Sequence, residues 1–409
     1  MNGKAESPHP GLSFGAFVLM MAGFMALNGL AVDTMLPALP AIGDDLGVEN
    51  PNSRQWVITS YLLGFGIFQL IYGPLSDRFG RRPVLLLGVS IYIVFSLITV
   101  FAGSFETVVL SRFLQGAGTA ASRVLVIAIV RDCYSGRKMA KVMSLSFIIF
   151  LLVPILAPAI GQGVMLFFSW HWIFLGLAIY AMGLTFWAWR YLPETLQGEH
   201  RLPLSLARVN TAFLLVVTTR QSLGYSVAMM LMMGTIFGYI NSAQQLFADT
   251  FNTPQLFTVY FAMTALSMAF ASLLNAHIVE RLGTRLVSHT AMCAMLVVSL
   301  LHWALALSGN ETLTAFVVFQ SLSMFFFGLA SPNFGAMAME PVGHIAGTAS
   351  SVQGCITTVG GAILGYLVGQ AFDGTAVPFA FSYVLLCLAS LVVLIVTEGR
   401  LFQPKHGSA

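Results

Sequence analysis

Two ionisable residues interrupt stretches of sequence that are otherwise apolar. Asp33 ends an apolar run that begins at Ser13, and it lies about one helical turn before Pro37. Arg112 lies about 10 Å, by helical rise, inside the apolar stretch 106–127. Charged side chains are costly in a bilayer and normally face a partner or a water-filled cavity. Burial favours the neutral form of a carboxyl group and a nearby guanidinium favours its charged form. We therefore predict that Asp33 and Arg112 bind and release a proton together. The alternative for Asp33 is a position at the membrane surface or a plain helix–helix contact.

Further polar groups follow Arg112 on one helix face. Gln115, Thr119 and Arg123 come after it at spacings of 3, 4 and 4 residues, the period of one face of an α-helix. We predict that this face lines a cavity. Arg123, deeper in the segment, has the alternative of extending to the membrane surface.

Other apolar segments also carry polar stripes. Asn241 and Gln245 lie on one face of the segment 222–247. Such groups at membrane depth either line a cavity or hold helices together, and the sequence leaves both interpretations open. On the first interpretation we predict a substrate-binding site that contains Met25, Asn28, Asp33, Tyr61, Gln115, Thr119, Asn241 and Gln245.

The elements that must position these residues are membrane-spanning helices. Of the 409 residues, 57% are hydrophobic and 9% are charged, whereas soluble domains carry roughly 25% charged residues. A span needs roughly 20 apolar helical residues. Segments of this kind predict an all-α integral membrane protein with twelve transmembrane helices, near 13–36, 55–73, 84–102, 106–127, 142–166, 170–189, 222–247, 256–278, 287–307, 312–333, 346–369 and 377–397.

The twelve segments divide into two groups of six. We predict an N-terminal bundle over 1–190, a cytoplasmic linker over 191–221, a C-terminal bundle over 222–400 and a tail over 401–409. The two halves also share a loop: "GPLSDRFGRRP" (73–83) matches "AHIVERLGTRL" (276–286) at an offset of 203 residues. The match includes an acid and a glycine as well as arginines, so we expect a duplicated, pseudo-symmetric architecture. Two unrelated basic loops are the alternative.

The basic residues predict the orientation. Of the 19 Lys and Arg residues, 16 lie in the tails and in the loops on one side, Arg54 lies on the other side, and Arg112 and Arg123 lie within a span. Positive loops remain in the cytoplasm. We therefore expect a multi-pass protein with both termini cytoplasmic.

The loop 73–83 resembles the signature of the major facilitator superfamily between spans two and three, and the resemblance extends over essentially the whole chain. Gly73 and Gly80 permit close approach and a tight turn, and Asp77 can pair with Arg81. The resemblance adds Asp132, in "VRDCY", as a third member of a ring that gates conformational change. We predict a gating role for Gly73, Asp77, Arg78, Gly80, Arg81 and Asp132. A basic loop that only sets topology is the alternative.

The fifth predicted span contains "FLLVPILAPAIGQG" (150–163). Pro154, Pro158 and Gly161 resemble a motif of the superfamily's drug–proton antiporters, although Ala157 stands where that motif usually has glycine. Because proline removes a helical hydrogen bond and glycine permits close packing, we predict a hinge or seal here. Prolines that merely occur in a transmembrane helix are the alternative.

The segments 32–42, 60–83, 112–122 and 131–134 together resemble the bicyclomycin/chloramphenicol-resistance branch of these exporters. The resemblance implies a proton-coupled antiporter that exports small, mostly apolar drugs or toxic compounds across a bacterial inner membrane, with Asp33 as its proton and substrate site. Some relatives have a second acid about two turns earlier, where this chain has Met25 and Ala26. A metabolite transporter on the same scaffold, or a membrane receptor that transports nothing, are the alternatives.

The sequence contains no GxxxxGK[ST] or HExxH motif and no Gly-rich dinucleotide fingerprint that follows a strand. We therefore expect a transporter rather than an enzyme, driven by the proton gradient, with no catalytic residue, cofactor or metal. Its expected partners are a small-molecule substrate, protons and the lipid bilayer, not nucleic acid, and we expect a monomer.

Overall fold

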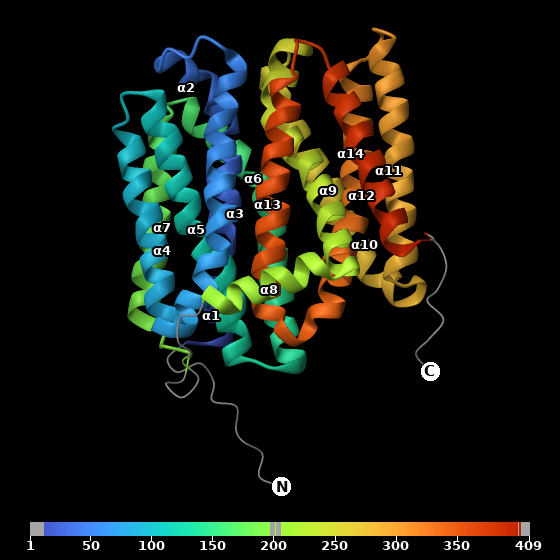
Figure 1. Cartoon of the computed structure of the whole chain (residues 1–409). Coiled ribbons are helices and arrows are strands. Elements are labelled where there is room, and N and C mark those ends of the chain that lie inside the picture. The colour runs from blue at the N-terminus through green and yellow to red at the C-terminus, as the bar shows by residue number, and fades with distance from the viewer. Residues whose placement is uncertain (1–11, 197–200, 202–205, 400, 402–409) are drawn as a thin grey trace. The chain divides into compact units, whose positions relative to one another are not determined.

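The computed structural model describes residues 12–196, 201, 206–399 and 401. These residues form helices joined by short turns, with no strand among them (Figure 1). The prediction of an all-α fold is confirmed. The two tails and parts of the predicted linker lie outside the described residues.

The first compact unit runs from Met1 to Asn210. Its long helices are α1 (Phe14–Asp33), α3 (Trp56–Phe79), α4 (Arg81–Val100), α5 (Phe105–Cys133), α6 (Gly136–Met165) and α7 (His171–Tyr191). The chain between α1 and α3 forms two 3-10 turns, η1 (Leu36–Ala38) and η2 (Pro51–Gln55), and the short helix α2 (Leu39–Asp45).

The second compact unit runs from Thr211 to Ala409. It contains α9 (Arg220–Gln245), α10 (Phe257–Leu282), α11 (Thr284–Leu307), α12 (Leu313–Met339), α13 (Ala346–Gln370) and α14 (Val377–Glu398), with the short elements η4 (Leu246–Thr250), η5 (Pro254–Leu256) and η6 (Glu340–Ile345). The boundary between the units lies within the predicted linker 191–221, which also contains the helix α8 (Leu206–Thr218).

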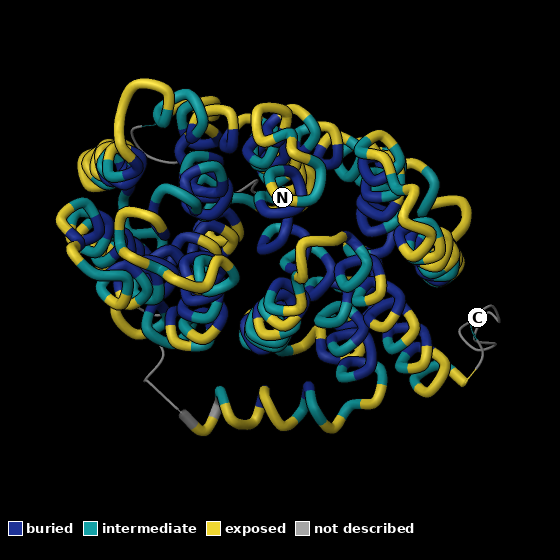
Figure 2. Tube along the Cα trace, turned by 90° about the horizontal axis from the view of Figure 1, so that it is seen from above, coloured by how far each residue is buried: buried dark blue, intermediate teal, exposed yellow. Residues whose placement is uncertain are grey.

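Each of the twelve predicted spans has a helix. Among the described residues, 11 continuous helical segments are long and apolar enough to cross a membrane, and one of them, Leu313–Gln370, has 58 residues and contains both α12 and α13. Exposed residues are frequent along the helices (yellow in Figure 2). Many of them are large and apolar, and more than half of the surface is exposed for Leu87, Phe186, Leu301 and Val396. Water is a poor solvent for such faces, whereas lipid tails are a good one.

The duplicated loop has the same backbone conformation in both units. Gly80 separates α3 from α4 at φ 103° and ψ 157°, and Gly283 separates α10 from α11 at φ 81° and ψ 154°. Residues with a side chain rarely adopt positive φ. The matched glycines therefore end one helix and start the next in each unit, as expected of a duplication.

Two glycines bring α3 and α5 into close contact. A Cβ at Gly64 would meet the backbone carbonyl of Phe113, and a Cβ at Gly116 would meet the backbone carbonyl of Tyr61. Small residues let transmembrane helices pack backbone to backbone. This crossing fixes the register of the polar face of α5 against α3.

Candidate functional site

Arg112 lies completely buried in the core of the first unit. Its guanidinium donates from Nε to the carbonyl of Val57 at 3.0 Å and from Nη2 to the carbonyl of Ala31 at 2.9 Å. Nη1 donates to Oε1 of Gln115 at 2.7 Å, and the ring of Tyr61 lies 4.3 Å below the guanidinium carbon. The charge is therefore held by backbone carbonyls, an amide and an aromatic face, which together offset part of the cost of burial.

The polar groups near Arg112 form one connected network. Gln115 Nε2 donates to Thr99 Oγ1 on α4 at 2.9 Å. The Tyr61 hydroxyl lies 2.7 Å from Thr119 Oγ1 and donates to Asn28 Oδ1 on α1 at 2.8 Å. The structure therefore brings α1, α3, α4 and α5 together around these groups. Arg123 does not join this network, because its side chain is exposed.

Asp33 is the last residue of α1 and is 5% exposed. Arg112 reaches the carbonyl of Ala31, two residues earlier, but among the described residues no ion pair or hydrogen bond of the Asp33 carboxyl group is recorded. The next side chain, Thr34, has a buried Oγ1 without a hydrogen-bond partner. Because an ionised carboxylate in such a place needs a counter-charge or donors, this arrangement fits a neutral, protonated Asp33.

The predicted substrate residues are divided between the two units. Met25 and Asn28 lie on α1 close to Asp33 in sequence, and Met25 is buried. Asn241 and Gln245 lie on α9 in the second unit and are also buried. The Asn241 amide donates to the carbonyl of Phe237 at 2.9 Å.

The predicted gating ring is present in the geometry of the first unit. Arg81 pairs through Nη1 with Asp77 at 2.7 Å and through Nε with Asp132 at 3.1 Å. Its Nη1 also donates to Ser76 Oγ at 2.6 Å, and the Ser76 hydroxyl donates to the carbonyl of Gly73 at 2.8 Å. The buried guanidinium thus joins the ends of α3, α4 and α5. Arg78, by contrast, is exposed.

Glu194 belongs to this cluster and was missed by sequence reasoning. Its carboxylate accepts from the backbone N–H groups of Arg81 at 2.8 Å and Arg82 at 3.3 Å, and so caps the N-terminus of α4. Thr195 also donates to Asp132, at 3.2 Å. The available signal was the acid in "LPET", directly after the sixth span of the first half.

The second unit carries a corresponding cluster after α10. Arg285 lies 3.3 Å from Glu398 and 3.7 Å from Glu340. The Tyr225 hydroxyl donates to Glu398 at 2.7 Å and lies 3.1 Å from Nε2 of His289. Here Glu398, at the end of α14, has the place that Glu194 has after α7.

The proline-containing segment of α6 packs against the end of α1. Val153 and Ala157 form a buried cluster with Ala26, and a Cβ at Gly161 would meet the carbonyl of Thr34, the residue after Asp33. The helix α6 continues through Pro154 and Pro158 without interruption, so the predicted hinge remains a prediction. A change in the packing of α6 would therefore change the contacts of Thr34, the residue next to Asp33.

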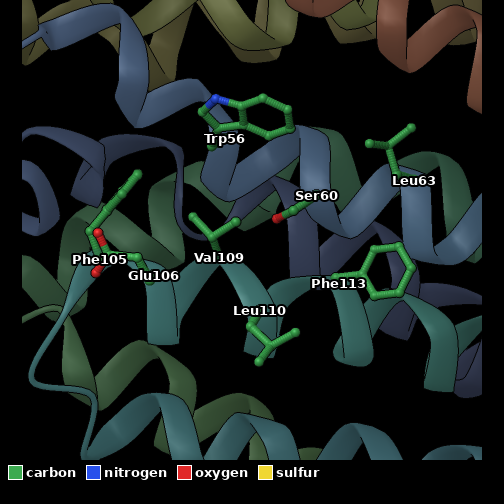
Figure 3. Close-up of a pocket in the computed structure, with 8 residues that line it drawn as sticks. All are labelled: Trp56, Ser60, Leu63, Phe105, Glu106, Val109, Leu110 and Phe113. Atoms are coloured by element: carbon green, nitrogen blue, oxygen red, sulfur yellow. The ribbon is translucent and has the colours of Figure 1, made fainter.

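An open pocket of about 510 Å³ lies between the first turns of α3 and α5, and none of the predicted substrate residues lines it. In Figure 3 the side chains of Trp56, Ser60 and Leu63 lie opposite those of Val109 and Phe113. Its remaining lining residues are Phe105, Glu106 and Leu110. The wall is mainly aromatic and aliphatic. Among the described residues, no group of three or more His, Cys, Asp or Glu side chains could hold a metal ion.

The family model described as Major Facilitator Superfamily matches residues 12–365. A bicyclomycin resistance protein homolog of Haemophilus influenzae is 32% identical over 375 residues, which cover 90% of this chain and 92% of that protein. A chloramphenicol resistance protein of Pseudomonas aeruginosa is 29% identical, with 94% and 90% covered, and multidrug resistance protein D of Escherichia coli is 27% identical, with 94% and 97% covered.

Two solved structures show the same fold. The human organic anion transporter MFSD10 superposes with a TM-score of 0.69 at 19% identity, covering 92% of this chain and 98% of that one. A D-xylose-proton symporter superposes with a TM-score of 0.73 at 14% identity, covering 94% and 99%. At these identities the likeness concerns the fold alone.

Proposed function

The chain belongs to the Major Facilitator Superfamily, and from this premise we propose that it is a proton-coupled antiporter that exports small, mostly apolar drugs or toxic compounds. It is a multi-pass membrane transporter rather than an enzyme. Relatives named for resistance to bicyclomycin, chloramphenicol and multiple drugs support export as the direction of transport. Bacterial relatives and the 16 basic residues on one side support an inner-membrane location with both termini cytoplasmic.

The observation that carries the proposal is the buried carboxyl group of Asp33 at the end of α1, where the nearby carbonyl of Ala31 accepts a hydrogen bond from the buried Arg112. Loss of the proton would leave a carboxylate in an apolar site, two residues from the carbonyl to which Nη2 of Arg112 donates. The resulting attraction would favour a rearrangement in which Arg112 exchanges the Ala31 carbonyl for Asp33. Proton loss and a change in the α1–α5 contact are then one event.

This linkage supplies an antiport cycle. Asp33 binds a proton while the site faces the acidic outside. The neutral carboxyl group no longer attracts the positive charge of Arg112. When the site faces the cytoplasm, substrate binding and proton release favour each other, because both depend on the same carboxyl group. The proton gradient then drives export with no cofactor.

The apolar character of the substrate has its own support. The open α3–α5 pocket is lined mainly by Trp56, Phe105, Phe113 and aliphatic side chains, and apolar pockets with few polar groups suit small apolar ligands. The predicted substrate residues supply Asp33 as their one acid, since Met25 and Ala26 stand where some relatives have another. We therefore propose a preference for neutral or singly charged compounds.

Transport by proteoliposomes under an imposed pH gradient tests the function. Wild-type protein should exchange protons for chloramphenicol or a similar compound, Asp33→Asn should abolish exchange, and Asp33→Glu should retain part of it. Full proton-driven efflux by Asp33→Asn would refute the coupling. Movement of sugars, nucleosides or amino-acid derivatives without any drug would instead favour a metabolite transporter.

A further inference from the structure

A second buried acid lies far along the chain from Asp33, at the end of α11 in the second unit. His302 Nε2 and Glu311 Oε1 are 2.6 Å apart, and their side chains are only 2% and 7% exposed. We propose that His302 and Glu311 form a proton-binding site that holds the turn between α11 and α12 closed. The inference does not depend on which substrate is transported.

The contact between His302 and Glu311 joins a helix to the turn that follows it. His302 lies on α11, whereas Glu311 lies in the turn, directly before Thr312, the N-cap of α12. Ser308, Gly309 and Asn310 in the same turn are exposed. Glu311 alone is drawn inward from a water-exposed turn, and it connects that turn to the preceding helix.

The surroundings are apolar and aromatic. The His302 ring stacks on Phe319 at 5.2 Å, with 5° between the planes, and lies 5.6 Å from Phe316 and 6.4 Å from Phe379. A net charge in such surroundings is costly, whereas a hydrogen-bonded pair of zero net charge is tolerated. Neutral histidine with ionised glutamate carries one net negative charge. The pair has zero net charge only when it binds one further proton, on either His302 or Glu311.

Other ionisable groups on the packed elements do not replace that proton. Tyr383 on α14 is engaged with the carbonyl of Thr235. Asp373, before α14, accepts from Thr375. Asp249 lies in η4, whose neighbour Phe247 packs on Phe316. Among the described residues, no ion pair joins any of these groups to His302 or Glu311.

The sign of the pH effect follows from the count of protons. In an open turn, Glu311 and His302 would face water, and near neutral pH they would carry an ionised carboxylate and a mostly neutral imidazole. The closed pair therefore holds more protons than the open one. The closed turn is favoured at low pH and is lost as the pH rises. On the predicted topology, this turn faces the acidic side of the membrane.

The test uses the full-length protein in vesicles. A cysteine placed by Ala306→Cys on the last turn of α11, a position only 7% exposed in the closed structure, is labelled with a membrane-impermeant maleimide from about pH 5 to about pH 9. Labelling of the unsubstituted chain, which has four cysteines, is subtracted. The matched control carries Glu311→Gln as well as the new cysteine, and its neutral amide accepts a hydrogen bond from neutral His302. The labelling rate without Glu311→Gln is divided by the rate with it, because this ratio cancels the pH dependence of the thiol's own reactivity.

We expect this ratio to rise with pH by up to about tenfold per unit before it levels off. A chain with His302→Ala should label faster than the wild-type background at low pH, because Glu311 then has no hydrogen-bond partner at its buried position. If that variant fails to fold, the pH dependence of the ratio between the chains with and without Glu311→Gln still tests the proposal. A constant ratio over the whole range would overturn the proposal.

Discussion

The two units build the same scaffold around different cores. Arg112 and Gln320 each lie eight residues after an N-cap, Ser104 in α5 and Thr312 in α12. Arg112 satisfies three acceptors. Gln320 donates to the Tyr383 hydroxyl at 3.0 Å, and its Oε1 has no hydrogen-bond partner among the described residues. The duplication therefore preserved the helix and its register. At this position the first unit has a buried cation, Arg112, and the second unit has a neutral amide, Gln320.

The clusters at the duplicated loops differ in the same direction. Arg81 is buried and contacts Asp77, Ser76 and Asp132 at 3.1 Å or less. Arg285 is 26% exposed, and its carboxylate partners lie at 3.3 and 3.7 Å. At the loop, the first unit thus has the shorter and more buried charge contacts, and at the position of Arg112 it has a buried cation. We infer that proton coupling is concentrated there, and that substitutions in the corresponding clusters of the two units should have unequal effects.

The largest difference is expected between Arg112→Ala and Gln320→Ala. Removal of Arg112 leaves the carbonyls of Ala31 and Val57 and the amide oxygen of Gln115 without their donor, at about 1–3 kcal/mol for each buried group. We expect loss of transport and a clearly lower thermal midpoint in detergent. Gln320→Ala should cost about 1–2 kcal/mol and keep transport. Equal losses in the two variants would contradict the assignment of coupling to the first unit.

Next in size is the close crossing of α3 and α5. Gly64→Ala places a Cβ against the Phe113 carbonyl, so the helices must separate at a cost of about 1–3 kcal/mol. Gly163→Ala on α6 is the control, because nothing lies within 4 Å of its Cβ position. Thermal unfolding followed by a thiol-reactive dye should show a lower midpoint for Gly64→Ala alone. An unchanged midpoint would mean that the crossing is looser than described.

A smaller difference is expected at the loops. Arg81→Ala removes a buried, charge-assisted contact worth about 1.5–3 kcal/mol, whereas Arg285→Ala removes a partly exposed one worth about 0–1 kcal/mol. We expect transport to slow severalfold in the first variant and little in the second. Initial rates of drug efflux, normalised to the amount of protein, give the comparison. A stronger effect of Arg285→Ala would place the main gate in the second unit.

The smallest effect is expected from Glu194→Gln. The amide keeps an acceptor for the first N–H groups of α4 but loses the charge that complements the helix dipole, about 0.3–1 kcal/mol. The thermal midpoint should fall slightly, and Glu194→Ala should lower it further because the acceptor is also lost. Identical midpoints in the two variants would show that the cap depends on charge alone.

Short-range patterns predicted much of this architecture. The twelve apolar segments each correspond to a helix, and the predicted pairing of Asp77 with Arg81 across the Gly80 turn is confirmed. The Gly80 turn and its Gly283 counterpart followed from the repeat. These features depend on hydrophobic length, helical period and the conformational freedom of glycine, all of which are local.

What sequence could not predict depends on contacts between distant segments. Arg112 was expected to meet Asp33, but its partners include the backbone carbonyls of Ala31 and Val57, and backbone acceptors leave no trace in the residue types. Glu194 reaches Arg81 from more than a hundred residues away, out of a stretch read as linker. The contact between His302 and Glu311 depends on a turn that folds an acid inward. Only the assembled bundle places these groups together.

The central claim is that Asp33 carries the coupled proton. Purified protein in weakly buffered detergent solution should release protons when chloramphenicol or a related substrate is added, as followed by a pH-sensitive dye. We predict that this release disappears in Asp33→Asn and persists in Gln320→Ala, while both variants still bind the compound or unfold at comparable temperatures. Undiminished release from Asp33→Asn would contradict the account.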